Sequence, residues 1–226
     1  MIPWLDPYGA PQFPATMSAL DEPNGLLAAG GALSVDWLTA AYYRGIFPWF
    51  GENEPVLWWS PAPRSILLPD NFHCSRSLQK LVRQGKYQIT RNRSFEAVIR
   101  HCAQTRSGQA GTWIVETMIN AYAAMHQAGL AHSFECWNAD NRLVGGLYGV
   151  SLGKVFFGES MFSLASNASK LCLNHLVKTQ QYELIDCQMT TPHLTSLGAT
   201  EVERDQFEAM LEKFVDCKGG VNLNCS

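Results

Sequence analysis

The spacing of apolar residues changes at His132, and this change constrains the fold more than any other feature of the sequence. Before His132, apolar side chains recur every three or four residues, which is the period of a helix with one buried face. From His132 onward apolar and polar residues alternate, which is typical of strands. A further helix and a returning strand follow. This order predicts an α+β fold in which helices pack against a sheet.

Residues that favour helix ends divide the chain into helices. Ser34 can accept a hydrogen bond at a helix N-terminus, and Gly45, Gly85 and Gly129 suit the position that follows a helix. In the second helix we expect Val82 on the buried face. The predicted helices cover residues 35–44, 75–84, 94–102 and 115–128, and a fifth runs from Ser166 or Asn167 to about Tyr182.

Strands are predicted at residues 132–137, 142–151, 155–161 and 184–189. Residues 138–141 read Asn-Ala-Asp-Asn, which is typical of a turn between two strands. Residues 1–33 are rich in Pro and Gly, so we expect extended or irregular structure there. Pro61 and Pro63 mark the best domain boundary, which predicts a small N-terminal domain at 1–62 and a larger domain at 63–226.

The composition is that of an ordinary globular protein, with 46% hydrophobic and 16% charged residues. No apolar run approaches the roughly 18 residues of a membrane span, and residues 1–7 lack the basic start and apolar stretch of a signal peptide. We therefore expect a cytoplasmic protein with no membrane partner. The seven cysteines include no Cys-x-x-Cys pair, which favours reduced thiols over a metal site.

The net charge of −3 conceals a local asymmetry. Residues 64–106 contain nine basic and two acidic residues, a charge of +7 that leaves −10 for the rest of the chain. Arg76, Lys80 and Arg83 are spaced so that they form one ridge of the predicted helix. This stretch is either a solvated surface or a face that binds phosphates.

Asp186 and Gln188 are two residues apart on a predicted strand, so we expect their side chains on the same face. The apolar neighbours Leu184, Ile185 and Met189 indicate that this strand is buried, where an unpaired carboxylate costs several kcal/mol. The two residues are therefore either a structural hydrogen-bonded pair or a site. If they form a site, the Asp186 carboxylate would orient and polarise the Gln188 amide, and the amide would in turn polarise a third group.

Glu159 is a carboxylate among aromatic residues. Strict alternation places it on the face of Phe157 and Met161, unless Gly158 marks a bulge. Apolar surroundings raise the pKa of a carboxyl group. Glu159 is therefore either the buried partner of an arginine or a group that meets a cationic ligand or transfers a proton.

Four tryptophans, Trp49, Trp58, Trp59 and Trp113, sit beside Pro or Gly in segments expected to be loops. Flat rings near a basic stretch suit the stacking of a nucleobase. Packing at a domain interface is the ordinary role of tryptophan, and we favour it for Trp58 and Trp59.

A series of unusual sequence blocks runs in order between about residues 20 and 200. Examples are Trp-Trp-Ser-Pro at 58–61, Gly-Glu-Ser-Met-Phe-Ser at 158–163 and Leu-Ile-Asp-Cys-Gln at 184–188. These blocks resemble the bacterial leucyl/phenylalanyl-tRNA–protein transferases. The full set comprises residues 22–27, 30–31, 44–50, 58–61, 111–114, 131–133, 144–149, 158–163, 167–170, 184–188 and 196–199.

The resemblance implies a small N-terminal domain and a C-terminal domain with the acetyltransferase-like (GNAT) fold, whose mixed, mostly antiparallel sheet is flanked by helices. It also implies an aminoacyltransferase that moves Leu or Phe, and less readily Met, from aminoacyl-tRNA to the N-terminal Arg or Lys of a protein. The product is a degradation signal of the N-end rule. Neither a metal nor an organic cofactor is implied, and we expect a monomer.

The resemblance also implies a role for each site residue. Asp186 would act on the attacking amine through Gln188, and Glu159 would orient an amine and offset its charge. Trp49 and Trp113 would stack on the 3′-terminal adenosine. The helix that carries the basic ridge would grip the tRNA acceptor stem without reading its sequence. An apolar pocket for the amino-acid side chain would be lined by Leu147, Phe156, Met161 and Ile185.

Two other classes of function remain open. An N-acyltransferase of the same superfamily that uses acyl-CoA would need a glycine-rich turn for the pyrophosphate, whereas residues 162–169 contain neither Gly nor Arg. A non-catalytic tRNA-binding module would leave the pairing of Asp186 with Gln188 unexplained.

Overall fold

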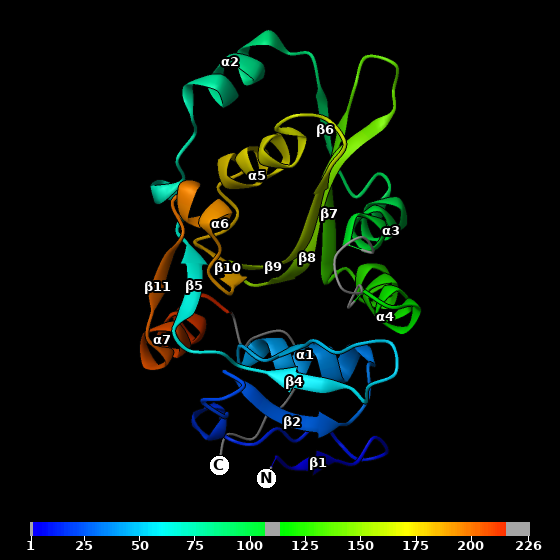
Figure 1. Cartoon of the computed structure of the whole chain (residues 1–226), viewed down its shortest axis with the longest axis vertical. Coiled ribbons are helices and arrows are strands. Elements are labelled where there is room, and N and C mark those ends of the chain that lie inside the picture. Colours follow the sequence, from blue (N-terminus) through cyan, green and yellow to red (C-terminus); the bar gives the residue numbers. More distant parts are fainter. Residues whose placement is uncertain (1, 107–113, 216–226) are drawn as a thin grey trace.

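The computed structural model describes residues 2–106 and 114–215, whose strands form two sheets (Figure 1). A four-stranded sheet has the order β1-β2-β4-β3, and a seven-stranded sheet has the order β11-β5-β10-β9-β8-β7-β6. The strands are β1 (Trp4–Leu5), β2 (Leu26–Gly30), β3 (Phe47–Pro48), β4 (Leu57–Trp59), β5 (Arg64–Leu67), β6 (Gln88–Arg91), β7 (Ala131–Trp137), β8 (Leu143–Leu152), β9 (Val155–Ser163), β10 (Leu184–Gln188) and β11 (Thr200–Val202).

The large sheet is mixed. Within the described residues its neighbouring strands are antiparallel, with the single exception of β9 and β10, which run parallel. A parallel pair needs a crossover, and the helix α5 (Ala168–Lys178) supplies it. The predicted α+β class is confirmed, as is the mixed, mostly antiparallel sheet.

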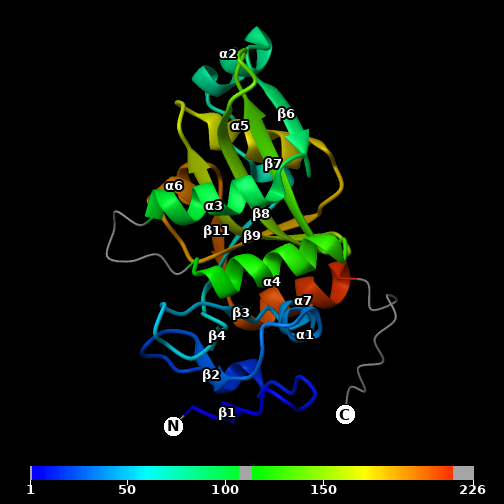
Figure 2. The same cartoon turned by 90° about the vertical axis from the view of Figure 1, so that its right-hand side faces the viewer.

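Helices cover both faces of the large sheet. Figures 1 and 2 show α3 and α4 on one face and α5 on the other, with α1 between the two sheets. The sheet therefore separates two cores, one beneath α3, α4 and α1 and the other beneath α5. The other helices are α1 (Val35–Tyr43), α2 (Arg76–Gln84), α3 (Phe95–Arg106), α4 (Glu116–Gln127), α6 (Pro192–Ser196) and α7 (Arg204–Phe214).

The predicted helix ends are largely confirmed by the local chemistry. The hydroxyl of Ser34 accepts a hydrogen bond from the backbone of Trp37, and Ser75 caps α2 in the same way through Leu78. Each such cap contributes about 1 kcal/mol. Gly85 ends α2 in the left-handed conformation.

Other predictions about local structure were wrong. The helix α5 ends at Lys178 rather than near Tyr182, and Asn167 precedes it in a left-handed conformation without a side-chain cap. The hydroxyl of Ser163, at the end of β9, accepts the bond from Ser169 instead. Val82 is exposed, because α2 lies at the periphery. The segment 1–33, expected to be extended or irregular, contributes the strands β1 and β2, so its extended part is confirmed.

Glycines in β8 permit close packing. A Cβ atom at Gly145 would lie 2.5 Å from the Cβ of Ala168 in α5. At Gly149 it would lie 2.1 Å from the carbonyl oxygen of Phe157 in β9. The neighbours that these glycines admit are therefore a helix and a strand of the same chain.

Among the described residues, no helix has the length and apolar character to cross a bilayer. The cysteines in this part of the chain form no disulfide.

Candidate active site in the split between two strands

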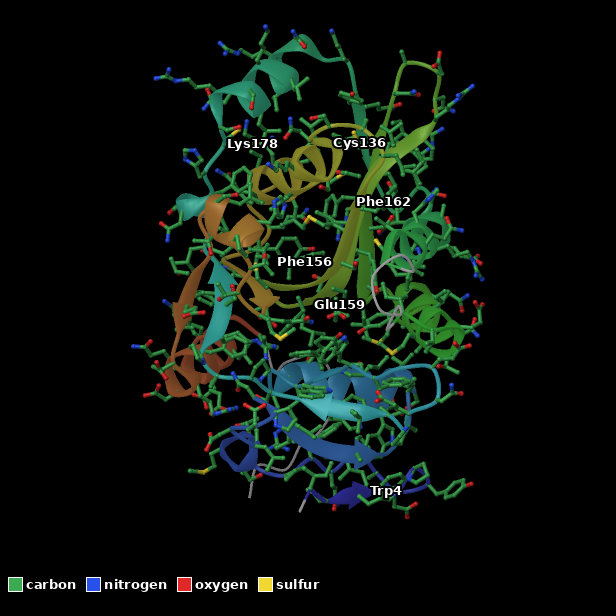
Figure 3. The ribbon with its side chains drawn as sticks, in the orientation of Figure 1. Trp4, Cys136, Phe156, Glu159, Phe162 and Lys178 are labelled. Carbon is green, nitrogen blue, oxygen red and sulfur yellow. The ribbon has the colours of Figure 1, made fainter. Side chains whose placement is uncertain are left out.

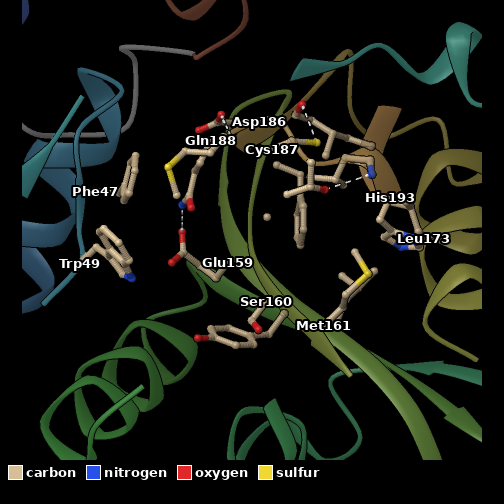
Figure 4. A pocket seen from close by; sticks show the side chains of 18 of the residues that line it. Phe47, Trp49, Glu159, Ser160, Met161, Leu173, Asp186, Cys187, Gln188 and His193 are labelled. Atoms are coloured by element: carbon tan, nitrogen blue, oxygen red, sulfur yellow. Dashed lines mark hydrogen bonds between the residues drawn. The ribbon is translucent and has the colours of Figure 1, made fainter. Parts of the chain in front are cut away.

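A cavity of about 280 Å³ lies where β9 and β10 separate. Their pairing ends at Phe157 and Asp186. Beyond that point the residues 158–161 of β9 and 186–189 at the end of β10 line the cavity (Figure 4). Eight of the predicted site residues line the cavity: Trp49, Leu147, Phe156, Glu159, Met161, Ile185, Asp186 and Gln188.

The split connects the two faces of the sheet. Leu147 pairs with Met161 across β8 and β9, so both side chains point to the α5 face, where Leu173 also lines the cavity. In Figure 4, Met161 and Leu173 lie on one side, while Phe47 and Trp49 lie on the other, with Glu159 between. We call the α5 side the apolar lobe and the side of Phe47 and Trp49 the aromatic lobe.

A bulge in β9 aims Glu159 at this junction. Tyr148 pairs with Ser160 but Gly149 pairs with Gly158, so Glu159 is the extra residue. The suggestion that Gly158 marks a bulge is therefore confirmed.

Glu159 is buried and accepts three hydrogen bonds. Tyr42 donates to Oε1 at 2.7 Å, Tyr122 donates to Oε2 at 2.8 Å, and Nε2 of Gln188 donates to Oε1 at 2.8 Å. Burial raises the pKa of Glu159 to about 7, although the two tyrosine hydroxyls oppose this effect. A carboxyl group that titrates near neutral pH is suited to proton transfer.

The side chains of Asp186 and Gln188 do not pair with each other in the way that a flat strand predicts. Gln188 has a φ of 62°, and the register of β10 shifts between these residues. The carboxylate of Asp186 accepts from the backbone N–H of Gln188 at 2.9 Å, while the Gln188 amide turns to Glu159. Asp186 itself is paired with Arg64 through two hydrogen bonds of 2.8 and 2.7 Å. The expectation of a paired carboxylate is confirmed, but the expectation that both side chains leave the same flat strand face is wrong.

The tryptophans divide between surface and core. Trp49 is 37% exposed, lines the cavity and meets the ring of Trp59 edge-on. Trp58 is fully buried against Trp37 and Phe13, which confirms its packing role. Trp113, the other predicted stacking residue, lies outside the described residues.

The basic ridge of α2, formed by Arg76, Lys80 and Arg83, is exposed but does not line the cavity. Figure 3 shows the basic side chains of α2 projecting from the end of the molecule opposite Trp4. Two other members of the basic stretch already form ion pairs with carboxylates of the same chain. Arg64 binds Asp186, and Arg100 binds Glu96 and Glu116 on the surface.

Sequence reasoning missed the two tyrosines that hold Glu159. Tyr42 and Tyr122 lie on the buried faces of α1 and α4, and the apolar period of a helix predicts burial but no role for their hydroxyls. A buried tyrosine needs a partner for its hydroxyl, so this pair was the available signal. Arg64 was likewise counted with the phosphate-binding stretch. Within the described residues no cluster of His, Cys, Asp or Glu is arranged to hold a metal ion.

The mixed sheet, the split between β9 and β10 and the buried carboxylate in that split define an α+β protein with a candidate catalytic site. Sequence comparison is more specific. The model of the family described as leucyl/phenylalanyl-tRNA protein transferase matches residues 66–212, and the model of that family's N-terminal domain matches residues 31–62. The chain belongs to this family of aminoacyltransferases.

Individual relatives agree over nearly the whole chain. Leucyl/phenylalanyl-tRNA–protein transferases of Cellvibrio japonicus and Nitrosospira multiformis are 54% and 53% identical, each over 96% of this chain and over 92% and 93% of the relative. The solved structure of L-PGS from Bacillus licheniformis overlaps with a TM-score of 0.41 at 13% identity, over 56% of this chain and 46% of that one.

Proposed function

We propose that the protein transfers Leu or Phe, and less readily Met, from aminoacyl-tRNA to the N-terminal Arg or Lys of an acceptor protein. The new peptide bond marks the acceptor for degradation. The observation that carries this proposal is the cavity in the split, where an apolar lobe meets a buried carboxylate and an amide. Family membership supports the same activity.

In this proposal each lobe receives one part of the donor. The amino-acid side chain enters the apolar lobe, formed by Leu147, Phe156, Met161 and Ile185 with Leu173. An apolar pocket rejects small or β-branched side chains by about 1–3 kcal/mol, which gives a preference rather than strict exclusion. The terminal adenosine lies in the aromatic lobe against Trp49, and its ester then spans the split.

The reaction is the aminolysis of an ester. The attacking nitrogen loses two protons, and each needs an acceptor. The acceptor enters as an ammonium group and gives one proton to the carboxylate of Glu159. The free amine attacks the ester carbon, a C–N bond forms, and the ribose oxygen leaves with the second proton from nitrogen. Gln188 orients the carboxylate, and Asp186 acts through Gln188 by fixing its backbone. Positioning two substrates is the main contribution, since the ester is already activated.

A transfer assay tests the proposal. The protein is incubated with tRNA carrying labelled Leu and with a peptide that begins with Arg, and a peptide with an acetylated N-terminus is the control. We expect the label on the free peptide and none on the blocked one. Label on neither peptide would contradict the proposal, and tRNA binding without transfer would favour a binding module.

A parallel arm with labelled acetyl-CoA tests the second candidate class. The N-terminus of α5, where an acyl-CoA enzyme would bind pyrophosphate, is already occupied. The hydroxyl of Ser163 accepts from the backbone of Ser169, and Ala168 packs directly on Gly145. We therefore expect no acetyl transfer to the peptide.

The ridge of α2 is proposed to bind the acceptor stem of the tRNA. Replacing Arg76, Lys80 and Arg83 together by Ala should weaken binding and reduce the slope of log affinity against log salt by about 1 for each phosphate that is no longer neutralised. Filter binding between low and moderate salt measures the slope. The control is Lys154→Ala with Lys213→Ala, which should leave it unchanged. An unaltered slope in the triple variant would place the tRNA on another surface.

Trp49 is proposed to stack on the terminal adenosine. Trp49→Ala should weaken the binding of an aminoacyl-adenosine by about 1–3 kcal/mol, because that is the contribution of one base stacked on an aromatic ring. Isothermal titration calorimetry measures this affinity. Trp4→Ala is the control, since Trp4 is also exposed but lies on β1, away from the cavity. Equal affinities for both variants would assign Trp49 to packing.

Three further features complete the proposal. Residues 1–62 form a small domain and 63–226 the catalytic domain, which is supported by the start of the large sheet at Arg64. The protein acts as a monomer. Its place is the cytoplasm, which is where aminoacyl-tRNA is available.

A further inference from the structure

Arg64 forms a buried ion pair at the floor of the candidate site. The guanidinium and the carboxylate of Asp186 are 1% and 0% exposed, and the two hydrogen bonds between them are 2.8 and 2.7 Å long. Burying two charges costs desolvation energy that their attraction only partly returns, and apolar side chains would hold two strands together as well. Stability alone therefore does not explain the pair.

The guanidinium also contacts two aromatic rings. It lies over the rings of Phe47 and Phe207, at 4.9 and 4.7 Å from their centroids. Phe47 belongs to β3 of the small sheet and Phe207 to α7, so elements far apart in the chain fix the position of Arg64. The planar fork of an arginine then fixes the orientation of the carboxylate that it holds.

The fixed carboxylate in turn holds Gln188. Asp186 Oδ1 accepts from the backbone N–H of Gln188 at 2.9 Å, across the register shift that ends β10. Gln188 is thereby kept at a φ of 62°, a left-handed conformation that costs a residue other than glycine free energy. In this conformation its amide donates a hydrogen bond to Glu159, 2.8 Å away.

We propose that Arg64 is a positioning residue for aminoacyl transfer, which acts through Asp186 to hold the Gln188 amide against Glu159. This inference rests on the proposed function for its kinetic consequences. It reassigns Arg64 from the phosphate-binding stretch to the interior of the site. It also means that Asp186 is a link in a chain of contacts that runs from Arg64 through Gln188 to Glu159.

Asp186 and Arg64 also determine the electrostatic environment of Glu159. The charge of Asp186 raises the pKa of Glu159, and the charge of Arg64 lowers it. Removing either partner alone should therefore shift the titration of Glu159 in opposite directions. The titratable groups that face Glu159 or line the cavity with it are Tyr42 from α1, Tyr122 from α4, Tyr148 from β8, Asp186 and Cys187 from β10, Arg64 from β5 and His193 from α6, and the Gln188 amide bonds to Glu159 directly.

Kinetics of three variants test the inference. Arg64→Lys keeps the charge but cannot bond to both carboxylate oxygens in the same planar geometry, so kcat should fall about tenfold or more while KM for aminoacyl-tRNA stays within about threefold. In the pH–rate profile, Arg64→Met should move the midpoint of the rise that belongs to Glu159 to higher pH, and Asp186→Asn should move it to lower pH. Arg100→Lys is the control, because Arg100 also binds a carboxylate, that of Glu116, through two nitrogens but lies on the surface. It should behave as wild type.

A spectroscopic reading separates this inference from the proposed function. In ¹⁵N-labelled protein, Arg64→Lys should move the side-chain amide resonances of Gln188 toward those of a free amide, whether or not transfer is measured. If the wild type transfers Leu and Arg64→Lys matches it in kcat and in this spectrum, the inference is overturned and the proposed function stands. If Arg64→Met does not fold, the Lys and Asn variants decide.

Discussion

Glu159→Gln should lower the rate of transfer by about 100-fold or more, because an amide cannot take a proton from the acceptor. The substitution preserves shape, and the neighbouring hydroxyls of Tyr42 and Tyr122 can turn to suit an amide. Single-turnover transfer from Leu-tRNA measures the effect. Glu135→Gln is the control, since Glu135 is equally buried in the large sheet but bonds to Ser133 and Thr90 outside the cavity. It should change the rate only a few-fold.

The dependence of the transfer rate on pH tests whether Glu159 accepts the proton. An ionised Glu159 is required, so the wild-type rate should rise with pH through about 7, where burial places its pKa. Because the acceptor enters as an ammonium group, the wild-type rate should fall again above the α-amino pKa of about 8. The Gln variant has no base and depends on acceptor that is already deprotonated, so its rate should instead rise near pH 8. A rise through about pH 7 in the variant, or a similar rate in both proteins, would remove Glu159 from proton transfer.

The free energy of unfolding should also depend on the pKa of Glu159, and it can be measured without substrate. The folded-state pKa of Glu159 lies above its ordinary value of 4.5. Its contribution is therefore fully present below pH 4.5 and is lost as pH rises through about 7. Relative to Glu159→Gln, the wild-type free energy of unfolding should fall over this window by at most about 3 kcal/mol. Urea titrations at several pH values measure it, and parallel curves would contradict the raised pKa.

Gly149→Ala should destabilise the protein by about 2–3 kcal/mol, because the added methyl group has no space. It would lie 2.1 Å from the carbonyl oxygen of Phe157 and 2.8 Å from the ring of Phe156. To admit it, β9 must move away from β8 at the bulge that presents Glu159. Transfer activity should therefore fall together with stability.

Gly9→Ala is the matched control, since the nearest atom to its added Cβ would be 3.7 Å away. It should change the free energy of unfolding by no more than about 0.5 kcal/mol. Urea unfolding compares the variants. A Gly149 variant that unfolds at the wild-type midpoint would show that the two strands separate more easily than the packing implies.

The helices α1 to α5 and the strands β7 to β10 could be predicted from sequence because their apolar periods are long and regular, whereas α6, α7 and β5 were not predicted. The stripe of Val98, Ile99 and Cys102 in α3 and the alternation along β7 and β8 are both found in the structure. Short strands at the sheet edges were not predicted. For example, β1 and β3 have two residues each, too few for a period to appear.

Family resemblance predicted which residues line the cavity, but the contacts among these residues were not predicted. A period of two assumes a flat strand, whereas the bulge at Glu159 and the left-handed Gln188 both depart from it. The hydrogen bonds of Tyr42 and Tyr122 arise from helices that are distant in sequence, and the partner of Asp186 lies 122 residues away. Such pairings depend on the tertiary structure, which no local pattern contains.

A crystal structure with phenylalanyl-adenosine joined by an amide in place of the ester would test the site most directly. We predict the phenyl ring in the apolar lobe between Leu147, Phe156 and Met161, the adenine against Trp49, and the amide carbon beside Gln188 and Glu159. A ligand bound on another surface, with the split between β9 and β10 empty, would contradict aminoacyl transfer at this site.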